Sequence, residues 1–270
     1  MRSRTLGVLL VLATLPALAQ VFGGPGVTHT TAVPLRRHAP MRFHGVRPDG
    51  TVESENWSGY AVTGSSFKVA KGSWTVPSVD CSKTPNTYAA FWVGIDGYSS
   101  NTVEQTGTDS DCDGTSPSYY AWYEFYPQPS FLIGSVPVSP GDQMSAKVTY
   151  SGSKFTITIK NVTTGKSFSK SEPVSGAQRS SAEWIAEAPC CTAGGGILPL
   201  SDFGTVYLGK DYTKVKSTNY ATDVSISGPI SKFGSDVYAI TMVSSGGADE
   251  AVPSSLTEDG TSFDVVWESE

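Results

Sequence analysis

Short segments in which apolar and polar residues alternate recur from Trp57 to Trp267, and turn residues separate them. The segments are rich in Val, Ile, Thr, Tyr, Phe and Trp, a composition typical of β-strands. The pattern predicts strands over residues 57–62, 68–76, 88–95, 102–107, 119–126, 143–150, 154–161, 167–171, 181–187, 204–208, 237–243 and 262–267. No segment combines helical periodicity with helix caps, so we expect an all-β sandwich or barrel with minimal helix.

Polar side chains interrupt the apolar faces of two of these strands. Alternation along a strand places Gln105 on the same face as Asp109, and Glu183 on the same face as Glu187. An amide and carboxyl groups facing one cleft would be suited to catalysis. Glu183 and Glu187 lie about 13 Å apart along the strand and point to the same side, so alternation alone does not choose between them.

Two further strands carry mixed aromatic and acidic faces. Trp92 and Asp96 share one face, as do Trp122, Glu124 and Tyr126. Faces of this composition more often line a binding groove than a dry core, although a solvated outer face of a sheet is the alternative.

The N-terminal residues differ from the rest of the chain. Residues 1–19 have the features of a secretory signal: two arginines, an apolar run over residues 6–18 and the small residues Ala17 and Ala19. No apolar run is long enough to span a bilayer, so we expect a secreted product without a membrane partner. Residues 20–53 read either as a solvated tail or as a pro-segment, and residues 54–270 as one domain.

Charge is distributed unevenly between the leader, residues 20–53, and the body, residues 54–270. Residues 54–270 hold 13 of the 19 Lys and Arg residues and 23 of the 25 Asp and Glu residues, a formal net charge of −10. Such a body repels nucleic acid and anionic membranes. The leader carries Arg36, Arg37, Arg42 and Arg47, and we expect these to lie against an acidic cleft and to release when its carboxylates are protonated.

Histidine and cysteine usage restricts the chemistry further. The three histidines all precede residue 54, which excludes Ser-His-Asp and Cys-His catalysis and His-ligated metals from residues 54–270. We therefore expect neither a metal nor a cofactor. The four cysteines Cys81, Cys112, Cys190 and Cys191 suit an oxidising compartment, and their three possible pairings stay open, with Cys81–Cys112 favoured.

Six ordered motifs resemble the successive blocks of the glutamic peptidases, or eqolisins. They are Asn56-Trp57-Ser58-Gly59-Tyr60, Gly72-Ser73-Trp74-Thr75-Val76-Pro77, Phe91-Trp92-Val93-Gly94-Ile95-Asp96-Gly97, Glu104-Gln105-Thr106-Gly107, Ala121-Trp122-Tyr123-Glu124-Phe125-Tyr126-Pro127 and Ala182-Glu183-Trp184-Ile185-Ala186-Glu187. The resemblance implies a lectin-like sandwich of two bent antiparallel sheets with about seven strands each. It also implies an acid endopeptidase that pepstatin does not inhibit.

The resemblance implies a catalytic pair, which falls on Gln105 and Glu183, with the Glu183 carboxylate activating water and the Gln105 amide stabilising the oxyanion. Residues that would line or support the site are Trp57, Trp92, Asp96, Asp109, Trp122, Glu124 and Tyr126. The expected partners are polypeptide substrates and the leader itself, as an inhibitor, and we expect the protein to be a monomer. A secreted carbohydrate-binding module, or a glycosidase that uses Glu124 with Glu183, is the alternative on the same kind of sandwich.

Overall fold

The computed structural model describes residues 36–190 and 196–270, so the signal segment and the leader up to residue 35 lie outside it. Strands occur in every region where the pattern predicts one. The strands of the described residues are β1 Phe43–Val46, β2 Val52–Ser54, β3 Trp57–Thr63, β4 Val69–Thr75, β5 Ala90–Ile95, β6 Val103–Asp113, β7 Ser116–Tyr126, β8 Phe131–Leu132, β9 Gln143–Ser151, β10 Lys154–Asn161, β11 Ser167–Glu172, β12 Ser181–Glu187, β13 Thr205–Leu208, β14 Tyr220–Thr222, β15 Ser227–Pro229, β16 Val237–Val243, β17 Asp249–Pro253 and β18 Phe263–Trp267. Helix is limited in these residues to α1, Lys210–Thr213, and a 3-10 segment, η1, Ile230–Asp236.

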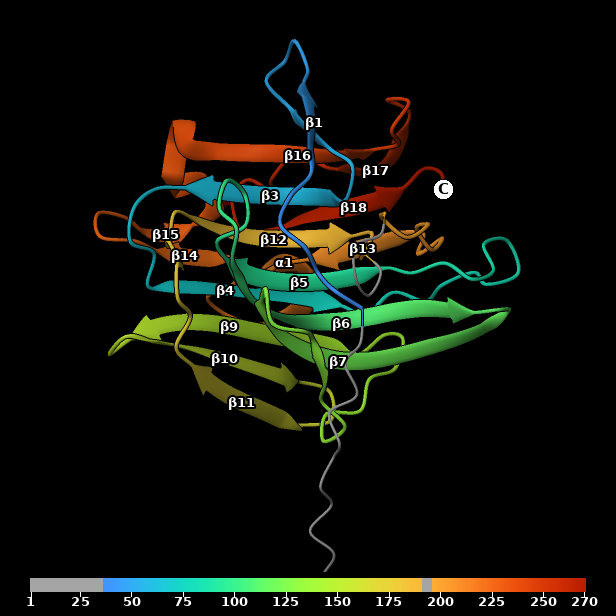
Figure 1. Ribbon diagram of the computed structural model, residues 1–270, viewed down its shortest axis with the longest axis horizontal. Coiled ribbons are helices and arrows are strands. Elements are labelled where there is room, and N and C mark those ends of the chain that lie inside the picture. The colour runs from blue at the N-terminus through green and yellow to red at the C-terminus, as the bar shows by residue number, and fades with distance from the viewer. Residues whose placement is uncertain (1–35, 191–195) are drawn as a thin grey trace, which may run out of the picture. The chain divides into compact units, whose positions relative to one another are not determined.

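The strands of the described residues form one hydrogen-bonded network (Figure 1). One antiparallel run has the order β16-β3-β12-β5-β6-β7, and another has the order β11-β10-β9-β4 and continues through β13 and β18 to β17. The β16–β17 pair joins the two runs. The expected division into two separate sheets of about seven strands is therefore not confirmed, because hydrogen bonding continues from one run into the other.

The main core contains side chains from both runs. Trp74 of β4, Phe91 of β5, Met144 of β9 and Trp184 of β12 are all fully buried in it. Burying a side chain of this size contributes about 1.5–3 kcal/mol. Strand β10 has the expected alternation, since its Phe155, Ile157 and Ile159 side chains are buried while Lys154 and Lys160 are exposed.

Strands β5, β6 and β12 are buried on both faces. The face opposite the main core holds a second cluster with three tryptophans, Trp57, Trp92 and Trp122, packed with Ile185. This second face carries the polar residues that the sequence pattern singles out. The apolar side chains on this face need a covering segment, and the leader lies over the face.

The described part of the leader is not a tail. Strand β1 pairs with β2, and the segment before β1 crosses in front of β3, β12 and β5 (the blue trace in Figure 1). The boundary predicted between residues 53 and 54 falls inside β2, and the alternation pattern predicted neither β1 nor β2. The turn-rich composition of the leader concealed both strands.

Two further expectations concern the pairing of the cysteines and the lack of a membrane-spanning segment. Cys81 and Cys112 form a disulfide, as favoured from the sequence. Cys191, the predicted partner of Cys190, lies outside the described residues. Within the described ranges, no helix is long and apolar enough to cross a membrane.

Candidate active site

Strand register places the predicted polar residues in rows across β12, β5, β6 and β7. In the first row Gly94 lies between Glu183 and Gln105, and Gln105 is opposite Glu124. In the third row Ala90 lies between Glu187 and Asp109. The second row, between these two, is Ile185, Trp92, Gly107 and Trp122. All three rows belong to one face of the sheet, as alternation predicts.

The ring of Trp92 lies over Gly94. A Cβ atom at Gly94 would sit 2.8 Å from Cζ3 of the Trp92 indole, and a Cβ atom at Gly107 would sit 2.6 Å from the Trp92 Cβ. The two glycines therefore make room for this side chain. Since Gly94 stands between Gln105 and Glu183, the indole occupies the space across which these two side chains would meet.

Glu187 is held by the same tryptophan. Trp92 Nε1 donates a 2.7 Å hydrogen bond to Glu187 Oε2, and the Trp92 ring packs edge-on against Trp57. Burial raises the pKa of the Glu187 carboxyl well above its usual value, and the charge of Glu124 raises this pKa further. The Trp92 hydrogen bond acts in the opposite direction, because it stabilises the carboxylate.

Glu183 has different electrostatic neighbours. Burial raises its pKa well above the usual value, and the charges that add to this effect are those of Asp96 and Glu104. Glu187 is influenced instead by Glu124 and Asp109. The structure thus groups Glu187 with Glu124 and Asp109, and Glu183 with Asp96 and Glu104.

Gln105 is oriented by Glu124. The Gln105 Nε2 atom donates to Glu124 Oε2 at 3.2 Å and to the backbone oxygen of His38 at 2.6 Å. Burial raises the pKa of Glu124 well above its usual value. Because the Glu124 carboxyl accepts from the amide nitrogen, it fixes which end of the Gln105 amide points into the site.

His38 of the leader fills the centre of the site and is fully buried. Its imidazole stacks on the Trp122 ring with centroids 3.5 Å apart, and its Nδ1 lies 3.3 Å from Glu187 Oε2. Its Nε2 lies 3.8 Å from Asp109 Oδ1. Burial lowers the pKa of His38 well below its usual value. Sequence reasoning missed this residue because it assigned all histidines to a region outside the body.

Asp96 stands apart from this group and organises the loop before β12. Its carboxylate accepts hydrogen bonds from the backbone N–H groups of Gln178, Arg179 and Ser180 at 2.8, 2.7 and 2.9 Å. It thereby fixes the start of the strand that carries Glu187. Tyr126, another predicted site residue, is half-buried at the edge of the second cluster.

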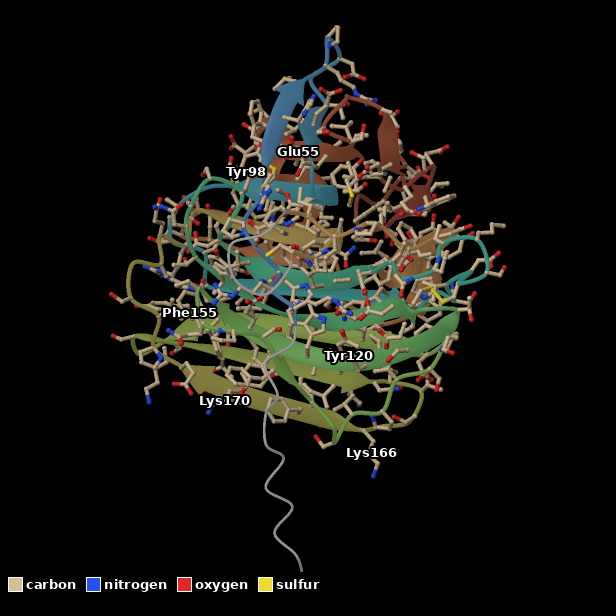
Figure 2. The ribbon with its side chains drawn as sticks, turned by 45° about the vertical axis from the view of Figure 1, so that its right-hand side comes forward. Glu55, Tyr98, Tyr120, Phe155, Lys166 and Lys170 are labelled. Atoms are coloured by element: carbon tan, nitrogen blue, oxygen red, sulfur yellow. A yellow bond between two sulfur atoms is a disulfide. The ribbon has the colours of Figure 1, made fainter. Side chains whose placement is uncertain are left out.

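The other end of the site contains a tyrosine and two aspartates. The hydroxyl of Tyr120 of β7, labelled in Figure 2, lies 2.8 Å from Asp109 Oδ2 and 2.7 Å from Asp111 Oδ2, within hydrogen-bonding distance of both. Arg36 of the leader pairs with Asp111 at 2.5 Å. Burial raises the pKa of Asp111 to about 6, although the Arg36 charge opposes this effect. Of the four leader arginines, Arg36 thus meets the acidic site as expected, whereas Arg47 pairs outside the Gln105 and Glu187 group with Glu53 and Asp249.

Comparison with known proteins identifies the family. Residues 55–252 match the model of the peptidase A4 family. The chain belongs to this family. It is 32% identical over 236 residues to scytalidopepsin B of Scytalidium lignicola, covering 84% of this chain and 88% of that protein.

Solved structures of the same family are similar to this fold. Scytalido-glutamic peptidase bound to a peptide-based transition state analog matches with a TM-score of 0.65 and 28% identity, covering 79% of this chain and 98% of that one. SCP-B, an eqolisin in complex with the tripeptide Ala-Ile-His, matches with a TM-score of 0.61 and 26% identity over the same shares. The relatives are glutamic peptidases, so this chain is a hydrolase of peptide bonds and its substrates are polypeptides. This finding removes the basis for the carbohydrate-binding and glycosidase alternatives.

Proposed function

We propose that the chain is a secreted acid endopeptidase in which Glu187 and Gln105 act together on the scissile bond. The observation that carries this pairing is that both side chains meet the same residue of the leader, His38. Gln105 Nε2 donates to the His38 carbonyl oxygen at 2.6 Å, and the His38 Nδ1 atom lies 3.3 Å from Glu187 Oε2. Glu187 therefore takes the role that sequence reasoning gave to Glu183.

In this mechanism the Glu187 carboxylate removes a proton from a water molecule as the water oxygen attacks the scissile carbonyl carbon. Glu187 then returns the proton to the departing amine nitrogen. The Gln105 amide donates a hydrogen bond to the developing oxyanion, a contribution on the order of 3 kcal/mol by comparison with other oxyanion-hole donors. Glu124 holds the Gln105 amide in the orientation that this donation requires.

A glutamine does not titrate, so this pair differs from two aspartates that share one proton. We therefore expect activity at low pH that pepstatin does not inhibit. Secretion is supported by the signal pattern of residues 1–19, and we expect a monomer. The SCP-B complex with the tripeptide Ala-Ile-His supports peptide binding by this chain.

The test is hydrolysis of a denatured protein between about pH 2 and 7, with and without pepstatin, by wild type and by Gln105→Ala. The proposal predicts acid-dependent hydrolysis that persists with pepstatin and falls strongly in the variant. Hydrolysis that pepstatin abolishes, or full activity of a folded Gln105→Ala protein, contradicts it.

A further inference from the structure

Four lysines surround one pocket of about 260 Å³ where β4, β9, β10 and the segment before β14 meet. Strands β4, β9 and β10 are neighbours in the sheet (Figure 1). The groups that line this lysine pocket include Lys71, Lys147, Lys160 and Lys216 and the hydroxyl groups of Ser145 and Thr158. Four of the 13 Lys and Arg residues of the body thus line a single pocket, and no acidic residue lines it.

The lysine pocket lies on the outer face of its strands. Strand β9 places Met144 and Val148 in the main core, so alternation directs Lys147 away from the core. Lys71 of β4 is opposite Lys147 and therefore shares this outer face. The candidate active site occupies the face of β5, β6 and β12 that is also opposite the main core. The core therefore separates the two sites, and a ligand in the lysine pocket leaves the active site open.

The lysines of the pocket repel one another. Lys71 and Lys147 are directly opposite on adjacent strands, an arrangement that is destabilising for like charges. Among the described residues, the pocket lysines form no ion pair, whereas Lys83, Lys170 and Lys210 each pair with a carboxylate. The body has a formal net charge of −10, so acidic residues are plentiful elsewhere in it. A bound anion would offset the repulsion in the pocket.

The fourth lysine, Lys216, belongs to a loop that is anchored to β4. The hydroxyl oxygen of Thr218 lies 2.7 Å from that of Ser73, within hydrogen-bonding distance. The backbone N–H of Ser73 donates to Asn219 Oδ1 at 3.2 Å. These bonds hold the backbone beside Lys216 against the strand that carries Lys71. The pocket is therefore formed before a ligand binds, which reduces the entropy lost on binding.

We propose that the lysine pocket binds a compact ligand that carries two or more phosphate groups. The lysine ammonium group is a compact point charge that binds phosphate oxygens, and the hydroxyl groups of Ser145 and Thr158 are further donors. One phosphate monoester carries a charge of about −1.5 to −2, so four lysines match a ligand with several such groups. Phosphate esters also keep a negative charge at acid pH, whereas a carboxylate ligand loses its charge near about pH 4.

The experiment measures binding to the full secreted chain by titration calorimetry at about pH 5, a pH at which phosphate esters remain ionised. The probes are tripolyphosphate, inositol hexakisphosphate and inorganic phosphate. We expect one of the first two to bind with one site per chain and on the order of tenfold more tightly than inorganic phosphate. At about 100 times its Kd, that probe should raise the Tm by about 5 °C.

The variant Lys147→Gln/Lys160→Gln removes two charges from exposed side chains of the pocket and should weaken binding by on the order of tenfold. Lys216→Gln, in the loop, is a second pocket variant that should weaken binding in the same direction. The matched control Lys83→Gln/Lys210→Gln removes two charges outside the pocket and should bind like wild type. Urea unfolding of each variant confirms that it is folded.

Weakening that is confined to the pocket variants supports the proposal. The tighter of the two probes then shows whether an inorganic phosphate chain or a phosphate ester is the preferred ligand. Equal weakening in the control variant would show that affinity follows overall charge and would refute the site. Failure of both probes to bind folded wild type refutes it as well. Neither result bears on the peptidase function, because hydrolysis of a denatured protein is measured separately.

Discussion

Replacing Glu104 by glutamine should remove part of the pH dependence of stability. Glu104 lies fully buried on β6, next to Gln105 in the chain. Burial, with the nearby charge of Asp96, raises the pKa of its carboxyl from 4.5 to about 9. In the unfolded chain this carboxyl ionises near its ordinary value, so the folded state holds one more proton over the pH range between the two values.

The sign follows from that difference. Because the folded-state pKa is raised, the contribution of Glu104 is present at low pH and is lost as the pH rises from 4.5 towards 9. Each pH unit in this window lowers the free energy of unfolding by about 1.4 kcal/mol, or about 4 kcal/mol between pH 5 and 8. In the Glu104→Gln variant this loss is absent, so the variant should gain about 4 kcal/mol relative to its parent between pH 5 and 8.

The assay is urea-induced unfolding at pH 5, 6, 7 and 8, comparing Glu187→Gln with the double variant Glu104→Gln/Glu187→Gln. The shared Glu187 substitution prevents self-digestion. The reasoning is supported if the difference in unfolding free energy between the two variants changes steadily with pH. A constant difference across the four pH values would refute it, because it would mean that Glu104 ionises alike in the folded and unfolded chains.

Three further predictions concern the residues around the site. Gln105→Ala should lower kcat by about 10²- to 10³-fold with little change in KM, as measured by steady-state hydrolysis of a peptide, because the lost donor acts on the oxyanion; a change confined to KM would contradict this. Trp92→Phe removes a hydrogen bond that lowers the pKa of Glu187, so the acidic limb of the pH–rate profile should move to higher pH; an unmoved limb would contradict it. Asp96→Asn keeps the size of the side chain but replaces an acceptor for the N–H groups of residues 178–180, and should destabilise the fold by on the order of 2 kcal/mol in urea unfolding; an unchanged midpoint would argue against that role.

Alternation along the strands was enough to predict much of the fold and of the face that carries the site. A strand such as β10 has one buried and one exposed face, so its pattern reveals it. The same rule grouped Gln105 with Asp109 and Trp122 with Glu124 along their own strands, and the register of β5, β6 and β7 places these residues on one face. The short strands β1 and β2 escaped prediction because their stability comes from pairing and not from an apolar pattern.

The proposal of Glu187 in place of Glu183 draws on the structure. Both side chains point to the same side of β12, so strand periodicity treats them as equivalent. They differ because the ring of Trp92 turns across Gly94 and donates its N–H to Glu187, a matter of side-chain rotamer that no sequence spacing records. The position of His38 was equally hidden, since it depends on how the leader crosses the strands.

The most direct test of the account compares Glu187→Gln with Glu183→Gln. Both variants replace a buried carboxyl on the same strand by an amide of the same shape, so each is a control for the other. Hydrolysis of a denatured protein at low pH is measured for each, alongside urea unfolding to confirm the fold. The account predicts that Glu187→Gln loses hydrolysis while Glu183→Gln retains it, and the reverse result would contradict the assignment of the catalytic base to Glu187.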